Sequence, residues 1–429
     1  MTTATHRLAS IAERRATGTP TGMTSVCSAH PLVIEAALRH GKRHSADVLI
    51  EATCNQVNQD GGYTGMTPVD FRRFVENIAH SVGFDTSRLI LGGDHLGPNP
   101  WKHLPAEVAL GKAETMIEAF AAAGFTKLHL DTSMGCSGEP APLGDEVTAA
   151  RAARLAERAE AVVAAQGGQA PIYVVGTEVP IPGGALEALD RVEVTSADAA
   201  LRTVDVHKHA FSRRHLDGAF ARVIAAVVQP GVEFGNADVV VYQPDKARAL
   251  AGVLAMMSHL VFEAHSTDYQ PRNALRALVE DGFAILKVGP GLTFALREAF
   301  YGLSQIADIL VPDADRKPLP DIMDEVMLGS PADWRKYYSG SEVQVALLRH
   351  YSFSDRIRYY WPATAALGAV TRLMRDLGER RVPLPLVSQF LGRLYDGVAA
   401  GVVAPTAREL ALASVCRVLD DYAFATGTL

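Results

Sequence analysis

Long apolar runs are missing from this sequence. No stretch reaches the roughly 18 consecutive apolar residues that a membrane-spanning helix needs. The segment Met1–Thr21 is polar and has no apolar signal core, so we expect a cytoplasmic protein that does not contact a membrane. Long basic runs are missing too. The 41 Lys and Arg residues are outnumbered by 48 Asp and Glu residues, a net charge of −7, which argues against nucleic-acid binding.

Cysteine is scarce, and its spacing excludes two kinds of stabilisation. The four cysteines contain no Cys-x-x-Cys pair, so we expect neither a disulfide framework nor a structural zinc site. Cys27, Cys54 and Cys136 each follow an apolar run, and we interpret them as small buried residues. A Gly-x-Gly-x-x-Gly turn is also missing after the first expected strand, which argues against a dinucleotide-binding open sheet.

The sequence instead alternates short apolar runs with longer amphipathic stretches, at a hydrophobic fraction of 48%. One of the helical stretches opens with Thr67 as its N-cap and Pro68 at the first helical position, a typical helix start. Eight of the apolar runs have the continuous Val, Ile and Leu character of parallel strands buried on both faces. These runs are Thr24–Cys27, Asp47–Ala52, Leu89–Gly92, Lys127–Leu130, Ile172–Gly176, Val223–Val228, His259–Glu263 and Ala284–Val288. Eight βα units predict an α/β fold, a closed (β/α)8 TIM barrel.

Two features of the pattern leave alternatives open. Val239–Tyr242 also looks like a strand, so either this run or Val223–Val228 is an extra element, and a doubly wound open sheet is the alternative fold. The composition changes at Val311–Pro318, which is typical of a linker, and the remainder is helical in pattern and rich in aromatics. We therefore expect a barrel with a short N-terminal segment over residues 1–312. A helical extension packed on the barrel would cover residues 313–429.

Acids, amides and imidazoles follow nearly all of the expected strands. In a barrel of this type, the loops after the strands build the active site at one end. Buried polar groups cost free energy unless they are paired or face a wet cavity, so we predict one site at these strand ends. The catalytic candidates are Glu51, Asp94, Asp131 and Lys287. The candidates for substrate binding are Ser28, Asn55, Gln56, Asn58, Gln59, Asn99, Gln229, Ser266, Asp268, Gly289, Gly291 and Arg356.

A metal site is predicted at the same end of the barrel. His95 and His265, joined by a carboxylate such as Glu178, form a mixed set that suits zinc or a similar divalent ion with an open position. Asp94 would share a small ion poorly with His95 if the two side chains diverge along the strand. We therefore assign Asp94 the role of proton acceptor. Each histidine taken alone could instead be a hydrogen-bonded core residue.

Four further features bear on substrate binding, and most of them have a second interpretation. The amide-rich loop Asn55–Gln59 suits a polyol, or it is an internally hydrogen-bonded loop. Lys287 could form a Schiff base with a ketose, although we favour an ion pair with Glu263. The segment Gly289–Thr293 could hold a phosphate at a helix N-terminus. In the segment Asp355–Tyr360, Arg356 could bind the same phosphate. Alternatively the segment is a surface helix, and for Arg358 we favour that surface position.

Several long motifs make the chain resemble a known family. They are Ser25-Val26-Cys27-Ser28-Ala29-His30-Pro31, Glu51-Ala52-Thr53, Asn55-Gln56-Val57-Asn58-Gln59, Gly92-Gly93-Asp94-His95-Leu96-Gly97-Pro98-Asn99, Gly176-Thr177-Glu178-Val179-Pro180, Val228-Gln229-Pro230-Gly231-Val232-Glu233-Phe234, Glu263-Ala264-His265-Ser266-Thr267-Asp268-Tyr269-Gln270, Leu286-Lys287-Val288-Gly289-Pro290 and Ser354-Asp355-Arg356-Ile357-Arg358-Tyr359-Tyr360-Trp361-Pro362. With them the chain resembles the Z-type subunit of tagatose-1,6-bisphosphate aldolase, the GatZ/KbaZ family. The resemblance covers nearly the whole chain apart from its two ends.

This resemblance implies a sugar-phosphate function in one of two forms. Z-type subunits are usually described as non-catalytic partners of a class II, zinc-dependent aldolase in galactitol and N-acetylgalactosamine breakdown. Other relatives are described as stand-alone tagatose 6-phosphate 4-epimerases, which yield fructose 6-phosphate. Some carry a kinase label, which we reject because no Gly-x-x-x-x-Gly-Lys-Ser/Thr loop is present. We expect a phosphorylated ketose as substrate and either an aldolase partner subunit or a homo-oligomer.

The polar strand ends favour an active enzyme over an inert scaffold. A divalent ion, zinc by our expectation, would chelate the C2 carbonyl and C3 hydroxyl of a ketose phosphate. Asp94 would remove the proton of the C4 hydroxyl while the C3–C4 bond breaks. If the aldehyde fragment leaves, the enzyme is an aldolase. If the fragment rotates and adds back, the enzyme is a 4-epimerase.

Overall fold

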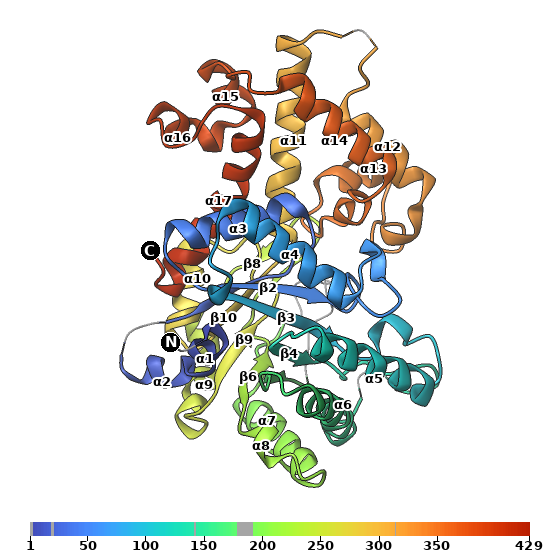
Figure 1. Cartoon of the computed structure of the whole chain (residues 1–429), viewed down its shortest axis with the longest axis vertical. Coiled ribbons are helices and arrows are strands. Elements are labelled where there is room, and N and C mark those ends of the chain that lie inside the picture. Colours follow the sequence, from blue (N-terminus) through green and yellow to red (C-terminus); the bar gives the residue numbers. More distant parts are fainter. Residues whose placement is uncertain (1–2, 19–20, 141–142, 178–191, 314) are drawn as a thin grey trace.

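The computed structural model describes residues 3–18, 21–140, 143–177, 192–313 and 315–429. Eight parallel strands form a closed barrel in the order β1-β10-β9-β6-β5-β4-β3-β2 (Figure 1). They are β1 (Met23–Val26), β2 (Val48–Thr53), β3 (Leu89–Leu96), β4 (Lys127–Leu130), β5 (Ile172–Val175), β6 (Val223–Val228), β9 (Val261–Ala264) and β10 (Ile285–Val288). The predicted (β/α)8 barrel is confirmed, and each predicted strand overlaps one of these eight.

The extra strand-like run lies outside the barrel. β7 (Glu233–Phe234) and β8 (Val239–Val240) pair as a small antiparallel sheet in the connection after β6. Val239–Tyr242 is therefore the additional element, and Val223–Val228 is the barrel strand. Since the eight barrel strands close on themselves, the open doubly wound sheet does not form.

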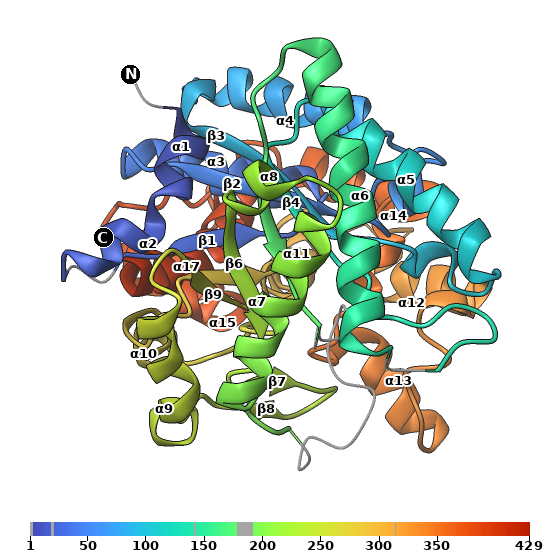
Figure 2. The same ribbon diagram turned by 90° about the horizontal axis from the view of Figure 1, so that it is seen from below.

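Helices surround the barrel because each one buries an apolar face against it. In α4, Phe71, Val75 and Ala79 recur at helical spacing and are buried, and the Thr67 hydroxyl with Asp70 forms the capping box that starts the helix. Figure 2 shows the helices arranged around the sheet. The barrel helices are α3 (Pro31–Arg43), α4 (Pro68–Val82), α5 (Ala106–Ala122), α6 (Asp145–Gln166), α7 (Ala197–Ser212), α8 (Asp217–Phe220), α9 (Pro244–Gly252), α10 (Arg272–Glu280) and α11 (Pro290–Leu310).

The barrel interior is apolar at one end and charged at the other. At the N-terminal end of the strands, Leu49 and Ile90 cluster with Leu8 of α1 (Ala4–Ala9) and Ile11 of α2 (Ile11–Ala16). These two short helices therefore seal the bottom of the barrel. The ionisable side chains of the strands are consequently confined to the middle and the C-terminal mouth, where the loops after the strands begin.

The chain beyond α11 forms a helical part above the barrel (Figure 1). Its helices are α12 (Leu319–Gly329), α13 (Glu342–Tyr351), α14 (Thr364–Leu377), α15 (Leu384–Phe390), α16 (Tyr395–Ala399) and α17 (Ala407–Thr426). The last helix, α17, returns to the barrel and packs against α3, α10 and α11. The division of the chain at residue 312 stays a prediction.

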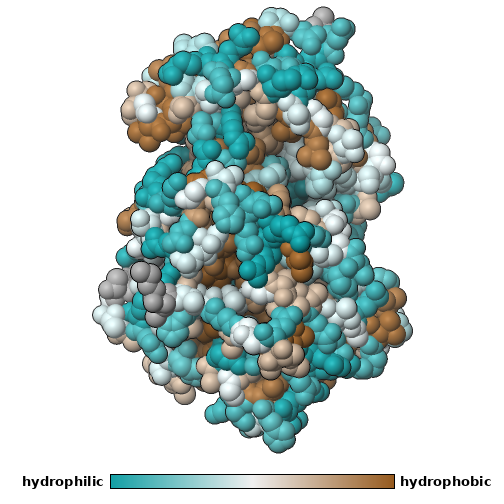
Figure 3. All heavy atoms as spheres, in the orientation of Figure 1, coloured by the Kyte–Doolittle hydropathy of each residue, from teal (hydrophilic) through white to brown (hydrophobic). Residues whose placement is uncertain are grey.

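The molecular surface is mixed in character. On the face seen in Figure 3, hydrophilic residues are interspersed with hydrophobic patches, and an indentation separates the helical part from the barrel. Among the described residues, no helix combines the length and hydropathy that crossing a membrane requires.

Candidate active site

The end of β3 departs from regular strand geometry. Adjacent residues of a regular strand point to opposite faces, but His95 has a φ of 50°, and the register of β3 with β4 shifts between Gly93 and Leu96. As a result, Asp94 Oδ2 lies 3.7 Å from His95 Nε2. The two side chains converge on the barrel mouth, so the condition under which Asp94 would share an ion poorly with His95 is not met.

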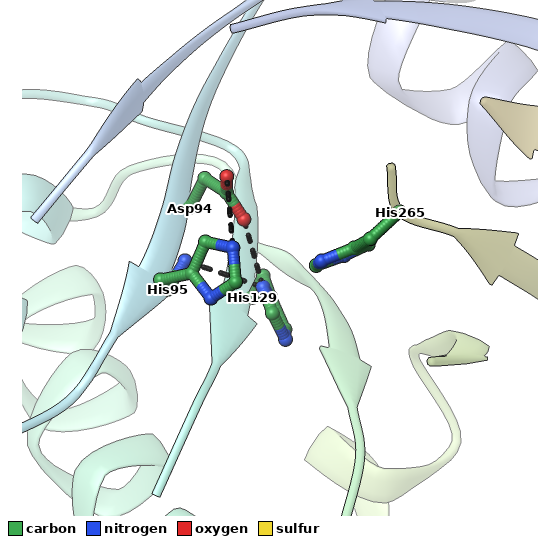
Figure 4. Close-up of side chains that lie close together, drawn as sticks. All are labelled: Asp94, His95, His129 and His265. Carbon is green, nitrogen blue, oxygen red and sulfur yellow. Dashed lines mark hydrogen bonds and ion pairs between the residues drawn. The ribbon is translucent and has the colours of Figure 1, made fainter. Parts of the chain in front are cut away.

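Three imidazoles and one carboxylate meet at this point. Asp94, His95, His129 and His265 each offer a ligand atom within 4.8 Å of the others, and Figure 4 shows them facing one another from β3, β4 and the end of β9. His129 was not among the predicted residues, because it lies inside a four-residue strand and not after one. The sequence signal that could have revealed His129 is an imidazole placed inside an otherwise apolar run.

His95 is oriented by Asp131. The Asp131 Oδ2 atom accepts a hydrogen bond from His95 Nδ1 at 2.7 Å, and its Oδ1 accepts the Ser133 hydroxyl at 2.8 Å. Burial alone would raise the pKa of Asp131, but the hydrogen bond and charge of His95 lower it to about 2. The carboxylate is therefore ionised and leaves His95 Nε2 facing the cluster, an arrangement common for metal-binding histidines.

His265 is held in its neutral form. Its Nε2 lies 3.0 Å from Glu263 Oε1. Burial lowers the pKa of His265 to about 3, although Glu263 opposes this. Neutral imidazole is the form that binds metal ions. His129 is fully buried, and its Nε2 has no hydrogen-bond partner among the described residues.

A layer of paired charges lies directly below the cluster. Lys127 Nζ is 2.5 Å from Glu51 Oε1 and 2.8 Å from Glu263 Oε2. Lys287 Nζ is 2.6 Å from Glu51 Oε2, contacts Asp94, and lies 3.7 Å from Glu263. The ion-pair interpretation of Lys287 is consistent with these contacts, with Glu51 and Asp94 closer than the Glu263 we named.

These buried groups carry an excess of negative charge. Four carboxylates (Glu51, Asp94, Asp131, Glu263) stand beside two ammonium groups (Lys127, Lys287), so two negative charges remain when the histidines are neutral. The excess acts on His95: burial would lower its pKa, but Asp94 and Asp131 raise it. Uncompensated buried charge is costly, and a divalent cation would balance it. The donor set, the unpartnered His129 Nε2 and this charge balance all fit such an ion.

A pocket opens above the cluster at the barrel mouth. Nine of the predicted residues line it: Asn55, Gln56, Asp94, His95, His265, Ser266, Asp268, Lys287 and Gly289. Lining residues that were not predicted as site residues include Cys27, Thr53, Tyr63, Phe234, Arg358 and Tyr359. The last two come from the helical part, so residues far apart in the sequence complete one pocket.

Other predicted residues lie around the pocket without lining it. Glu51 and Asp131 sit behind Lys287 and His95, as their contacts show. In the amide-rich loop, Asn58 bonds backbone groups of Cys54, Asp60 and Gly62, and Gln59 bonds Lys112. The polyol interpretation of that loop therefore extends to Asn55 and to the amide nitrogen of Gln56, because Gln56 Oε1 accepts the Thr53 N–H at 2.9 Å and the other two amides hold the loop together.

The remaining predicted residues are engaged elsewhere. Ser28 lies in an adjoining, largely apolar cavity beside α14. Gln229 Oε1 accepts the backbone N–H groups of Gly231 and Val232, and Asn99 bonds the Cys54 thiol. Glu178 lies outside the described residues.

The predicted phosphate site requires a correction. The backbone N–H groups of Gly289 and Gly291 both donate to Asp268 Oδ1, at 2.9 and 2.7 Å, so the N-terminus of α11 is already occupied by a carboxylate. Arg356 is buried with its guanidinium 3.4 Å from the centre of the Tyr337 ring and does not line the pocket. Arg358, expected on a surface helix, is half-buried and lines the pocket instead.

Arg358 retains free hydrogen-bonding capacity. Its Nη1 donates to the carbonyl oxygens of Ser354 and Asp355, and its Nη2 lies 3.2 Å from the Tyr359 hydroxyl. A guanidinium has five N–H donors, so two remain. No carboxylate of the described residues lies within ion-pair distance of Arg358. An anionic group in the pocket would therefore meet a cation that none of the described carboxylates contacts directly, although its charge acts on Asp355 and Asp268.

Three comparisons with known proteins each match nearly the whole chain. The family model described as D-tagatose-1,6-bisphosphate aldolase subunit GatZ/KbaZ-like matches residues 8–427. The chain is 51% identical over 420 residues to the D-tagatose 6-phosphate 4-epimerase of Agrobacterium fabrum strain C58, covering 98% of each chain. It is also similar to the crystal structure of a probable tagatose 6 phosphate kinase from Sinorhizobium meliloti 1021. That likeness has 57% identity and a TM-score of 0.88, over 94% of this chain and 100% of the other.

Proposed function

The chain belongs to the D-tagatose-1,6-bisphosphate aldolase subunit GatZ/KbaZ-like family, and on that premise we propose that it is a sugar-phosphate 4-epimerase. Its substrate would be D-tagatose 6-phosphate and its product D-fructose 6-phosphate, the activity for which the Agrobacterium fabrum relative is named. We further place this reaction in galactitol and tagatose catabolism in the cytoplasm.

One observation carries the proposal: an ionised carboxylate, two imidazoles and a lysine line a pocket, and a third imidazole stands behind them. The same pocket contains an arginine that has no carboxylate of the described residues within ion-pair distance. A ketose phosphate needs a proton acceptor, a group that polarises its carbonyl and a cation for its phosphate. Asp94, the histidine cluster and Arg358 supply one each. A purely structural subunit has no need to bury these charges at such cost.

We propose that His95, His265 and His129 hold a divalent ion, with zinc the best match to imidazole donors. When bound there, the ion would polarise the C2 carbonyl of the ketose and stabilise negative charge on the neighbouring oxygens. The fourth member of the cluster, Asp94, is left for proton transfer because Lys287 and His129 already hold its Oδ1.

Asp94 is suited to accept the C4 hydroxyl proton. Burial alone would raise the pKa of Asp94, but the charges of His95 and Lys287 hold it well below its usual range, so the carboxylate is ionised. Its Oδ2 is the freer oxygen and lies at the pocket. As O4 gives its proton to Asp94, the C3–C4 bond breaks, the electron pair stays on C3, and an aldehyde forms at C4.

Epimerisation requires that the aldehyde fragment stays bound and rotates so that its opposite face is presented to C3. C3 then attacks the opposite face of the aldehyde, and Asp94 returns the proton to O4. The fragment carries the phosphate, which would be held by the two free donors of Arg358. Asn55, Gln56 and Ser266 line the same pocket and offer hydrogen bonds to the hydroxyl groups.

The proposal is tested with the purified chain and D-tagatose 6-phosphate, without ATP and without a partner protein. We expect D-fructose 6-phosphate to appear, turnover to stop after chelation of metal, and zinc to restore it. A parallel reaction with ATP separates epimerisation from phosphoryl transfer, which would yield a bisphosphate. If zinc-loaded protein converts no D-tagatose 6-phosphate, the epimerase assignment is wrong.

The second candidate is an accessory subunit of a class II D-tagatose-1,6-bisphosphate aldolase. It is favoured by an apolar stripe on α13, where Val343, Leu347 and Tyr351 recur every four residues and are 80%, 58% and 51% exposed. Such stripes often mark protein interfaces, including those of homo-oligomers. Co-purification with an aldolase subunit, together with no activity alone, would establish this role. Failure of Val343→Asp/Leu347→Asp to disturb the complex would exclude the stripe as the contact.

A further inference from the structure

A second group of metal-ligand residues lies away from the barrel mouth, between α3 and α17. His40 and His44 are one helical turn apart at the end of α3, and their ring centroids are 4.5 Å apart. Asp420 of α17 places its Oδ1 3.1 Å from His40 Nε2. One ligand atom from each of the three residues lies within 4.8 Å of the others.

One donor atom of the group is free, and the other two residues already hold each other at hydrogen-bond distance. His44 Nε2 is buried and has no hydrogen-bond partner among the described residues. Arg417 lies 4.0 Å from Asp420 Oδ2, which leaves Oδ1 turned toward His40.

The surroundings select the class of ion. Arg417 and Arg43 both act on Asp420, so an ion held by charge alone, such as calcium or magnesium, is disfavoured. Two imidazoles spaced i, i+4 across the C-terminal end of a helix suit zinc and similar transition ions. His40 and His44 also line a cavity of about 320 Å³ at the base of β1 and β2, and water in that cavity can complete the coordination.

We infer that His40, His44 and Asp420 form a second site for a zinc-class divalent ion, which fastens the C-terminal helix α17 to α3. Ion binding at this site would also affect the barrel mouth, because α17 contacts the loop after His265. Two residues after Asp420, the Tyr422 hydroxyl donates to the Thr267 carbonyl oxygen at 2.8 Å, in the loop that follows His265. An ion at Asp420 thus steadies the helix that supports this loop. The inference does not depend on the proposed epimerase activity.

The test separates this site from the barrel mouth. Metal-free His95→Ala/His265→Ala protein, whose mouth has lost two donors, is titrated with Zn²⁺ while binding and thermal stability are followed. We expect one ion to bind and to raise Tm. Adding His44→Ala should weaken binding by more than about 100-fold, since changes to outer partners alone cost 10–100-fold. Adding His80→Ala instead, at an exposed histidine of α4, should change nothing.

Either of two results would overturn the inference: no zinc bound by the double variant, or equal affinity after His44→Ala. If the double variant does not fold, Co²⁺ absorption of the otherwise unchanged chain replaces it. His44→Ala should then lose part of the cobalt spectrum, whereas His80→Ala should keep all of it. A cobalt spectrum identical to that of the parent chain would refute the second site even if the first is confirmed.

Discussion

His95 shows how the site depends on a single backbone angle. Its φ of 50° lies in the left-handed region, which costs a non-glycine residue roughly 1–2 kcal/mol. Ser266, which also lines the pocket, has a φ of 54°. One strained residue therefore belongs to the metal-ligand cluster, and the other directly follows its member His265. The strain brings the His95 imidazole to the same side as the Asp94 carboxylate, which regular strand geometry forbids.

Replacing the proton acceptor tests the division of roles between these two neighbours. Asp94→Asn keeps the shape of the side chain but removes its basicity, so we expect kcat on D-tagatose 6-phosphate to fall by about 10²–10⁴. The bound metal, measured by elemental analysis, should remain because the histidines are unchanged. Asp60→Asn, at an exposed carboxylate, is the control. Loss of metal together with activity would assign Asp94 to the ion instead.

Asp355 should make stability depend on pH. Burial raises its pKa to about 7, against the lowering effects of Arg358 and the Thr293 hydroxyl. The folded chain thus keeps this proton up to pH 7, whereas the unfolded chain loses it near pH 4. The stabilisation is complete below pH 4 and is lost as the pH rises to 7. Denaturant unfolding at pH 5 and 8 should show wild type losing about 3 kcal/mol more than Asp355→Asn. Parallel losses in the two proteins would contradict the assignment.

At the scale of elements, β2 and β3 approach each other through a glycine. A Cβ placed on Gly92 would lie 2.8 Å from Glu51 Oε1 and 2.7 Å from its Cγ. The absence of a side chain at Gly92 gives Glu51 the room to reach Lys127 and Lys287. Gly92, the last residue of the predicted strand, therefore serves the charged layer below the pocket.

Gly92→Ala tests this close approach. The added methyl group should displace Glu51 and weaken its ion pair with Lys287. The overpacking should lower the free energy of unfolding by about 1–3 kcal/mol. Turnover should fall as well, because Lys287 contacts Asp94. The control is Gly111→Ala in α5, where a Cβ meets nothing within 4 Å. That helical glycine should stabilise the protein by about 0.5–1 kcal/mol when replaced. Equal effects of the two changes would be inconsistent with the crowding at Gly92.

At the scale of the whole molecule, the helical part completes the pocket that the barrel begins. Arg358 and Tyr359 reach the barrel mouth from the extension, and Tyr359 packs edge-on against Tyr63 from the loop after β2 at 4.7 Å between ring centres. The barrel supplies acid, base and metal ligands, while the extension supplies the unpaired cation. The extension is thus part of the site and not only a covering on the barrel.

Removing that cation should separate phosphate binding from chemistry. Arg358→Ala loses charged hydrogen bonds worth about 1.5–3 kcal/mol, so we expect KM for D-tagatose 6-phosphate to rise roughly 10–100-fold. Conversion of unphosphorylated D-tagatose should be equally poor in both proteins. Arg335→Ala, at an exposed arginine of the same extension, should leave KM unchanged. If Arg358→Ala alters only kcat, the phosphate is held elsewhere.

The sequence by itself determined the barrel, because runs such as Val223–Val228 have the continuous apolar pattern that only a strand buried on both faces requires. It also located most of the polar groups, since the loops after parallel strands must meet at one end. The tertiary structure alone decided which of them face the pocket. His129, Lys127 and Arg358 owe their roles to side chains that are close in space but distant along the chain. The convergence of Asp94 and His95 depends on one left-handed backbone angle, which no periodic pattern encodes.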